Sequence, residues 1–287
     1  SSSTMEIKSL SNICLDELFE AFEQAFANYE VRLNKAEFLT MLKRRGFDPK
    51  VSFGAFDGNK IVSFTYNGIG DFYGTPTAYD TGTGTLRNYQ GKGLATQVFE
   101  YSIPHLKKNG IKEYLLEVLQ HNTGAFSVYR KLGFEVTREF YYFKSKNEEI
   151  NKAIRTPGFP YTLKSIRIDE HNSIRNFWDF EPSWQNSLEA IKRSLKDFIC
   201  LGVFSESKLV GYGIFEPVSG DVTQIAVDKQ FRRRGIGSLL FLTMLESNKH
   251  SSIKIINTDI RCNSITAFLK SKNIEPAGKQ FEMKKKL

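Results

Sequence analysis

Cysteine and histidine are scarce in this chain of 287 residues. The three cysteines, Cys14, Cys200 and Cys262, lie far apart and form no C-x-x-C pair. This argues against a disulfide framework and against a thiolate metal site. The four histidines also lack the i, i+4 spacing that would place two imidazoles on one helix face. We therefore predict no metal site.

Long hydrophobic runs are absent as well. No segment approaches the roughly 18 consecutive apolar residues that a membrane-spanning helix needs. Nothing near the start has the charged and then apolar pattern of a signal peptide. We expect a soluble, cytoplasmic protein without a membrane partner.

Charge is distributed unevenly. Residues 1–150 contain 18 Lys and Arg against 18 Asp and Glu, whereas residues 151–287 contain 22 against 14. The sharpest basic cluster is Arg232, Arg233 and Arg234, and the chain ends in Lys284-Lys285-Lys286-Leu287. Neither cluster is joined by stacking aromatics in an extended basic groove, so we do not expect nucleic-acid binding.

A glycine-containing loop stands between a Thr/Gly-rich strand at 81–86 and an apolar run at 94–103. Its residues are Gln90, Gly91, Lys92, Gly93, Leu94 and Ala95. Two glycines let the backbone N–H groups turn into one hollow, and the following helix adds the positive end of its dipole. Such a loop can hold a pyrophosphate, although a glycine turn before a helix is often an ordinary connection.

A second motif follows a strand-like run at 114–118. It reads Asn122-x-x-Ala125-x-x-x-Tyr129 and continues into Leu132-Gly133-Phe134. Together the loop and this motif resemble the GNAT superfamily of N-acetyltransferases. That family's acetyl-CoA signature is Gln/Arg-x-x-Gly-x-Gly/Ala, which Gln90, Gly93 and Ala95 match.

The signature occurs a second time, as Arg232-Arg233-Arg234-Gly235-Ile236-Gly237. The hairpin pattern at 201–215 likewise repeats the one at 53–64, which indicates an internal duplication. We predict an α+β protein with two tandem GNAT folds, each a central mixed, mostly antiparallel sheet flanked by helices. The predicted parts are an N-terminal domain at 5–147, a linker at 148–160 that contains Pro157, Gly158 and Pro160, and a C-terminal domain at 161–287.

Periodicity and turn residues predict the elements within each domain. In the first domain we expect strands at 5–10, 51–56, 61–66, 78–86, 113–118 and 135–144, helices at 15–26, after Asn34, at 94–108 and at 124–132, and a connection at 67–76. In the second we expect a strand at 161–168, helices near 171–180 and 185–196, and hairpin strands at 201–204 and 208–215. Pro104 should kink or end its helix.

The resemblance implies the groups that hold acetyl-CoA as co-substrate. Backbone groups of the fourth strand would align the pantetheine and the acetyl group, and an N–H aimed at the acetyl oxygen would serve as an oxyanion donor. The implied cofactor residues are Thr83, Gly84, Thr85, Gln90, Gly91, Lys92, Gly93, Leu94, Ala95 and Asn122 in the first domain, and Ala226, Val227, Arg232, Arg233, Arg234, Gly235, Ile236 and Gly237 in the second.

The resemblance also implies the catalytic residues. Tyr129 matches the tyrosine that protonates the leaving thiolate, and a phenol with a pKa near 10 stays protonated at neutral pH. Glu117 occupies the position of a general base in ribosomal-protein N-acetyltransferases, although many related strands carry a glutamate without that duty. His121 is a weaker alternative base.

The second domain departs from the motif. Aligning Ile274 with Phe134 places Leu269 opposite Tyr129, whereas aligning Asn263 with Asn122 places Lys270 there. Neither side chain is a phenol, and Asn273 replaces the glycine. The second domain is therefore expected either to bind CoA without catalysis or to act as a structural partner.

The function that the resemblance implies is an acetyl-CoA-dependent N-acetyltransferase that acts by direct transfer in a ternary complex. The acceptor would be a primary amine of a small molecule or peptide, which the residues do not identify. A CoA-binding sensor or scaffold without turnover is the alternative, and a longer acyl donor remains open. Asp71, Asp80 and Glu117 could attract a cationic amine, or could simply be solvated.

Overall fold

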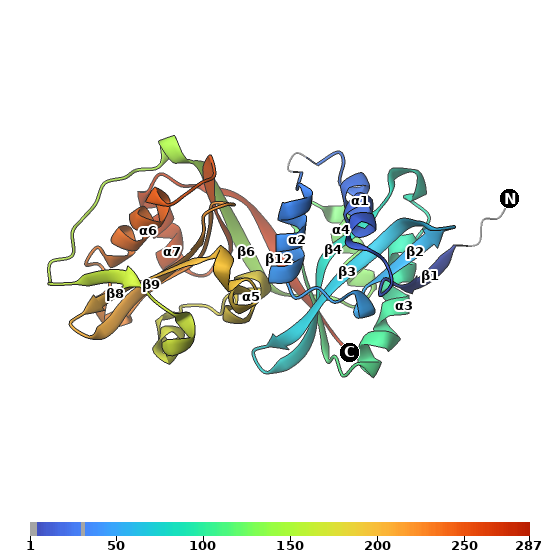
Figure 1. Cartoon of the computed structure of the whole chain (residues 1–287), viewed down its shortest axis with the longest axis horizontal. Coiled ribbons are helices and arrows are strands. Elements are labelled where there is room, and N and C mark those ends of the chain that lie inside the picture. Colours follow the sequence, from blue (N-terminus) through green and yellow to red (C-terminus); the bar gives the residue numbers. More distant parts are fainter. Residues whose placement is uncertain (1–4, 30–31) are drawn as a thin grey trace. The chain divides into compact units, whose positions relative to one another are not determined.

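The computed structural model describes residues 5–29 and 32–287. The chain divides into two compact units, which are described separately. Unit 1 comprises residues 1–137 and 281–287, and unit 2 comprises residues 138–280. Blue to green elements in Figure 1 form most of unit 1, and yellow to red elements form most of unit 2.

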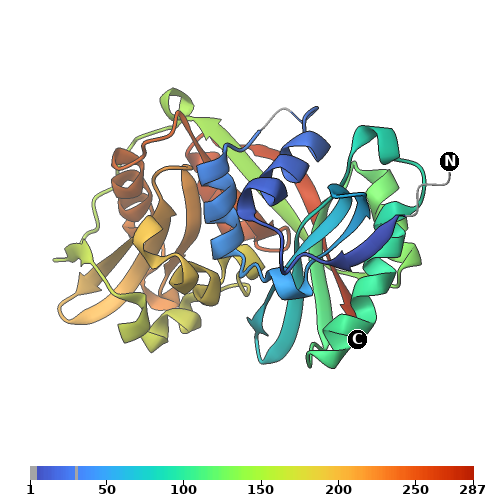
Figure 2. The same cartoon turned by 45° about the vertical axis from the view of Figure 1, so that its right-hand side comes forward.

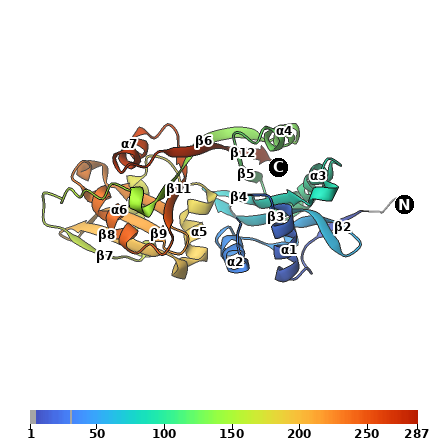
Figure 3. The same cartoon turned by 90° about the horizontal axis from the view of Figure 1, so that it is seen from above.

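Unit 1 is a sheet with helices on both faces. Its strands lie in the order β1-β2-β3-β4-β5-β12. The α1 and α2 helices cover one face, and α3 and α4 cover the other (Figure 3). The bounds are β1 (Glu6–Ser9), α1 (Leu15–Ala25), α2 (Lys35–Arg44), β2 (Phe53–Asp57), β3 (Lys60–Phe72), β4 (Thr75–Thr85), α3 (Leu94–Lys108), β5 (Glu113–Leu119) and α4 (Thr123–Lys131), with β12 (Pro276–Lys286) at the end of the chain.

Unit 2 repeats this arrangement with shorter helices before its hairpin. Its strands lie in the order β6-β11-β10-β9-β8-β7. The bounds are β6 (Glu135–Lys146), β7 (Thr162–Ser165), α5 (Leu188–Arg193), β8 (Ile199–Ser205), β9 (Lys208–Glu216), β10 (Asp221–Val227), α6 (Ile236–Glu246), β11 (Ser252–Asp259) and α7 (Asn263–Ser271). Both units are therefore mixed sheets flanked by helices, as the sequence predicts.

The two units exchange their last strands. Most of β6 pairs antiparallel with β11 of unit 2, from Phe140 opposite Asp259 to Lys146 opposite Ser252. The end of β12 belongs to unit 1, where Met283 enters the core and the Leu287 N–H donates to the Lys112 carbonyl. Figures 1 and 2 both show the red end of β12 beside green elements of unit 1. The boundaries of the units thus differ from those of the predicted domains, 5–147 and 161–287. The reason is that each half of the chain supplies one strand to the other unit.

Some predicted elements also differ in extent. The connection expected at 67–76 is a tight turn, because β3 and β4 pair as far as Phe72 opposite Thr75. The α3 helix passes through Pro104 and ends at Lys108. Where helices were expected near 171–180 and 185–196, the structure has short 3₁₀ turns and the six-residue α5.

Local sequence explains several of these elements. Asn34 caps α2 by accepting the N–H of Glu37, while the Glu37 carboxylate accepts the Asn34 N–H. This reciprocal capping box satisfies two backbone donors that a helix start otherwise leaves unpaired. Gly58, at φ 61°, occupies the turn of the β2–β3 hairpin, in a conformation that favours glycine.

Parallel strands diverge in the middle of each sheet. In unit 1, β4 pairs with β5 from Thr77 opposite Glu113 to Tyr79 opposite Leu115, after which both strands continue apart. In unit 2, β10 pairs with β11 where Asp221 lies opposite Lys254. A β-bulge occurs near each divergence, at Thr81 in β4 and at Thr223 in β10. Bulges redirect strands and often lie beside functional sites.

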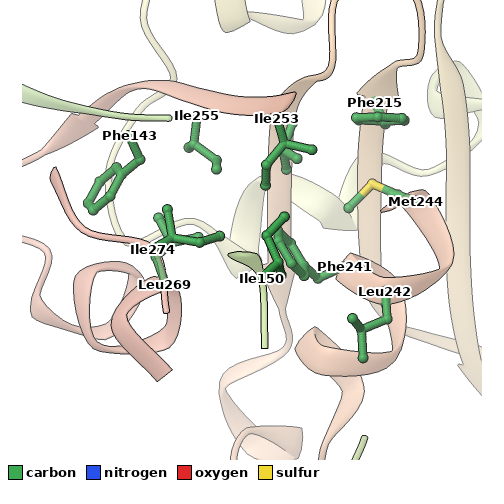
Figure 4. Packing of buried hydrophobic residues seen from close by; sticks show 11 residues of the cluster. Phe143, Ile150, Phe215, Phe241, Leu242, Met244, Ile253, Ile255, Leu269 and Ile274 are labelled. Atoms are coloured by element: carbon green, nitrogen blue, oxygen red, sulfur yellow. The ribbon is translucent and has the colours of Figure 1, made fainter. Parts of the chain in front are cut away.

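Apolar side chains fill the space between sheet and helices in each unit. In unit 2, Phe143 of β6 and Phe215 of β9 meet Phe241 of α6 and Leu269 of α7 (Figure 4). Ile150, from the segment after β6, belongs to the same cluster. A strand and a connecting segment that were assigned to the first domain and the linker therefore complete the core of unit 2.

Candidate active site

The loop before α3 has the backbone geometry that its glycines predict. Gly91 and Gly93 have φ values of 76° and 73°, in the left-handed region that favours glycine. A Cβ at either position would meet no atom within 4 Å, so the space around the loop is open. The Gln90 side-chain amide donates to the Thr85 carbonyl at 3.1 Å, which ties the loop to the end of β4. Open N–H groups at the start of a 15-residue helix suit a bound anion.

The glycines and the threonines at the end of β4 face opposite sides of the sheet. Gly84 lies against α1, where a Cβ would come within 2.8 Å of both Ala25 and Phe64. Thr83 and Thr85 point to the opposite face, where Thr85 shares a 2.8 Å hydrogen bond with Ser63. Glycine at 84 thus has a packing reason, while the threonine face lies toward α3 and α4.

Tyr129 projects from α4 toward that threonine face. Its ring contacts Phe99 and Phe134 with centroid distances of 5.7 and 5.8 Å. Its hydroxyl lies near the Thr83 side chain. Burial, and then the nearby charge of Asp80, raise the pKa of Tyr129 above its usual value. The phenol is therefore protonated throughout the neutral range.

Asp80 is the charged neighbour of Tyr129 on β4. Its Oδ2 accepts the Thr83 hydroxyl at 2.7 Å, while its Oδ1 is buried without a hydrogen-bond partner among the residues described. Burial raises the pKa of Asp80 to about 6, against the opposing hydrogen bonds from Thr83 and Gly82. The sequence suggested Asp80 only as a carboxylate that attracts an amine or is solvated, because its place beside the bulge depends on how β3 and β4 pair.

Glu117 lies on β5 and accepts a 2.9 Å hydrogen bond from the Tyr79 hydroxyl. Burial and then the Glu117 charge raise the pKa of Tyr79, while Arg45 opposes them. Arg45 also donates to the Thr81 carbonyl at the bulge, at 3.1 Å. The sequence did not single out Tyr79 or Arg45. Only the pairing of β4 with β5, which sets Tyr79 opposite Leu115, brings the tyrosine within reach of Glu117.

Asn122 has a structural task at the start of α4. Its Oδ1 accepts the Ala125 N–H at 3.2 Å as the N-cap, and its side chain is exposed. The cap fixes the first turn of the helix that carries Tyr129. The predicted contact of Asn122 with a CoA arm stays a prediction.

The second loop has the same fold but different surroundings. Gly235 has a φ of 87° and caps α6 as Gly93 caps α3. Arg233 stands where the first loop has Gly91, yet its φ is 63°. Arg232 donates to both carboxylate oxygens of Asp179 at 3.1 and 2.9 Å, and to the Phe177 carbonyl at 3.0 Å.

Hydrogen bonds at the end of α7 decide between the two alignments that the sequence left open. The Ile274 N–H donates to the Leu269 carbonyl at 2.9 Å, just as the Phe134 N–H donates to the Tyr129 carbonyl at 3.0 Å. Leu269 therefore stands at the position of Tyr129, and it is buried. Likewise Cys262 takes the N-cap position of Asn122.

Unit 2 contains a cavity of about 810 Å³ beside its loop. Tyr212 lines it, but its hydroxyl accepts from Trp178 at 2.6 Å and donates to Gln224 at 2.7 Å. Burial raises the pKa of Tyr212 above its usual value. This phenol donates its proton to Gln224 of the neighbouring strand β10, so Tyr212 does not replace the missing Tyr129.

Comparison with known proteins gives the family. The profile of the acetyltransferase (GNAT) family matches residues 14–134 and again residues 163–265. The chain belongs to the GNAT family. A tandem GNAT protein from the clavulanic acid biosynthesis pathway matches this fold with a TM-score of 0.75, covering 99% of this chain and 98% of that chain at 14% identity. The tandem arrangement predicted from the repeated loop is thereby confirmed at the level of the fold.

Curated GNAT relatives match parts of the chain. N-alpha-acetyltransferase MAK3 of Arabidopsis thaliana is 28% identical over 95 residues, which are 33% of this chain and 50% of the relative. Mycothiol acetyltransferase of Catenulispora acidiphila is 36% identical over 95 residues, which are 31% of this chain and 29% of the relative. The matches therefore span half or less of the length of these two relatives.

The described residues contain neither a candidate membrane-spanning helix nor a metal-binding cluster. No helix among them is long and apolar enough to cross a membrane. No group of three or more His, Cys, Asp or Glu side chains within residues 5–29 and 32–287 could hold a metal ion.

Proposed function

We propose that this GNAT protein is an acetyl-CoA-dependent N-acetyltransferase whose chemistry takes place in unit 1. The observation that carries this proposal is the phenol of Tyr129 on the threonine face of β4, next to Thr83 and Asp80. Unit 2 has Leu269 at the same position. A proton donor for the leaving thiolate is thus available in one unit.

The cofactor would enter where β4 and β5 separate. The open loop around Gly91 and Gly93 would hold the pyrophosphate by backbone N–H groups, with the α3 dipole favouring its charge. Backbone groups of Thr83 to Thr85, beyond the last residue pair between β4 and β5, would hold the pantetheine and acetyl group. A backbone N–H there would stabilise the oxyanion.

The reaction then needs two protons removed from the acceptor nitrogen and one proton supplied to the CoA sulfur. A base takes a proton from the acceptor ammonium, and the neutral amine attacks the thioester carbon. The resulting tetrahedral intermediate collapses with cleavage of the carbon–sulfur bond. Tyr129 gives its proton to the departing thiolate and regains a proton as the second one leaves the nitrogen, so that the products are an amide and CoA. No acyl-enzyme is required, which corresponds to direct transfer in a ternary complex.

Two carboxylates could act as the base. Glu117, which accepts the Tyr79 hydroxyl, is our primary assignment from its place on β5. Asp80 is the second candidate, because burial raises its pKa to about 6, where a carboxylate is a better base than at its usual pKa. The acceptor would be a primary amine on a small molecule or peptide.

Release of CoA thiol tests this proposal. The protein is incubated with acetyl-CoA and a panel of polyamines, amino acids, aminoglycosides and short peptides, and the thiol is measured over time. We expect release that depends on the amine and that falls about 100-fold or more in Tyr129→Phe at unchanged acetyl-CoA affinity. Full turnover by Tyr129→Phe would overturn the assignment of the acid. Binding of acetyl-CoA without amine-dependent release would instead favour a CoA-binding sensor.

A further inference from the structure

The first half of the predicted linker lies across the second glycine loop. We call residues 149–155 the strap. Asn151 donates its N–H to the Lys272 carbonyl at 2.9 Å and its side-chain amide to the Ser271 carbonyl at 3.1 Å. Asn273 donates its side-chain amide to the Glu149 carbonyl at 2.9 Å. The strap is thus held at several points to the C-terminal end of α7.

One side chain anchors the strap in the core. Ile150 is 6% exposed and lies in the cluster that contains Phe241, Leu269 and Ile274 (Figure 4). Burial of an isoleucine side chain stabilises the packed arrangement. The strap is therefore fixed by apolar packing as well as by hydrogen bonds.

The far end of the strap touches the loop itself. A Cβ placed on Gly235 would lie 2.2 Å from the carbonyl oxygen of Arg155. Lys272 connects the two helices at this point, since its ammonium donates to the Ala153 carbonyl at 3.0 Å and to the Ser238 hydroxyl. The strap therefore runs from the end of α7 to the start of α6, where Arg155 contacts the loop at Gly235 and lines the same cavity as the loop.

The residues that hold the strap are those at which unit 2 departs from the family motif. In register with the Tyr129 to Phe134 segment, Lys272 replaces Leu132 and Asn273 replaces Gly133. Asn273 keeps the left-handed backbone, with a φ of 62° against 93° for Gly133. Both replacements supply a side chain that binds a strap carbonyl, which leucine and glycine cannot do.

Among the described residues, none makes an equivalent contact with the first loop. A Cβ on Gly93 would meet no atom within 4 Å, whereas the equivalent Gly235 meets the strap. We propose that the strap closes the cofactor loop of unit 2, so that this loop takes acetyl-CoA only when the strap is released. The choice of acetyl-CoA as ligand rests on the proposed function. The closed loop lowers the apparent affinity of unit 2 by the fraction of molecules in which the strap is displaced.

Counting acetyl-CoA sites by calorimetry tests the strap. The test variant, Lys272→Leu with Asn273→Gly, restores the pattern of unit 1 and removes two strap contacts. The matched control, Lys270→Leu, makes the same chemical change at an exposed position of the same helix. Amide exchange over residues 149–155 checks that the strap is released, and thermal denaturation checks that each variant is folded.

We expect the released variant to bind one more acetyl-CoA per chain than the wild type, with an affinity in unit 2 about tenfold or more above that of the wild type. Lys270→Leu should match the wild type. Equal counts in the wild type and a folded, strap-released variant would overturn the proposal. If the first loop did not bind acetyl-CoA, the wild type and the released variant would each lose one site. That result would count against the proposed function, while the difference between the two proteins would still test the strap.

Discussion

The two glycine loops share a backbone and differ in what surrounds it. Each lies nine residues after a bulged threonine, each leads into a helix through a left-handed glycine, and each follows strands that diverge. The first loop is open, whereas the second meets the strap at Gly235 and has its first arginine paired with Asp179. Loop geometry alone is therefore insufficient to assign a cofactor site.

The two units also differ at the positions of Asp80 and Tyr129. Asp80 lies immediately before the bulge of β4, and Val222 lies immediately before the bulge of β10. Tyr129 is likewise replaced by Leu269. Unit 2 has apolar core residues where unit 1 has a carboxylate and a phenol, so the same fold is stabilised without the polar groups that we propose for catalysis.

The largest expected effect distinguishes Tyr129 of unit 1 from Tyr212 of unit 2. Tyr129→Phe should lower turnover about 100-fold or more, because the thiolate then leaves without its proton donor. The matched change Tyr212→Phe should leave turnover unaltered and lower stability by about 1 to 3 kcal/mol, because Trp178 and Gln224 lose their partner. Initial rates and thermal denaturation measure both. A larger loss of turnover from Tyr212→Phe would reverse the roles of the units.

The next effect concerns Asp80, the carboxylate that precedes the β-bulge of unit 1. The folded-state pKa of Asp80, about 6, lies above its ordinary value of 3.8, so ionisation destabilises the fold as the pH rises through this window. We expect Asp80→Asn to be more stable than the wild type by about 2 kcal/mol above pH 6, with the difference vanishing below about pH 4. Denaturation across pH 4 to 8 tests this, and a constant difference between the two proteins would contradict it.

The smallest effect concerns backbone strain. Arg233 has a φ of 63° at the place where unit 1 has Gly91. A residue with a Cβ costs about 1 kcal/mol in this conformation, part of which is offset because glycine is more flexible in the unfolded chain. Arg233→Gly should therefore stabilise the protein by about 0.5 kcal/mol, raising the melting temperature slightly. A lower melting temperature would show that the arginine side chain contributes more than the strain costs.

Sequence patterns predicted the turns, caps and loop conformations that depend on residues close together in the chain. The hairpin turn at Gly58, the cap at Asn34 and the left-handed glycines of both loops follow from local chemistry. The family resemblance singled out Tyr129, which lies near Thr83 of the fourth strand. Repetition of the loop predicted the tandem fold, which the family match confirms.

Features that depend on distant residues were not predicted. Alternation in β6 and β12 is the same whichever unit receives the strand, so the exchange of strands leaves no trace in the pattern. The partner of Arg232 lies 53 residues earlier, and Lys272 meets the strap 119 residues from its own position. These contacts decide which loop is open, and they arise only from tertiary packing.

We propose that acetyl transfer uses the loop of unit 1 and not that of unit 2. Gly91→Asp and Arg233→Asp form a matched pair, because each places a carboxylate at the same left-handed position of its loop. Steady-state release of CoA thiol on one amine acceptor, at subsaturating acetyl-CoA, measures both. We predict that Gly91→Asp lowers the rate about 100-fold or more through repulsion of the pyrophosphate, while Arg233→Asp stays within about twofold of the wild type. Loss of activity in Arg233→Asp with full activity in Gly91→Asp would contradict the account.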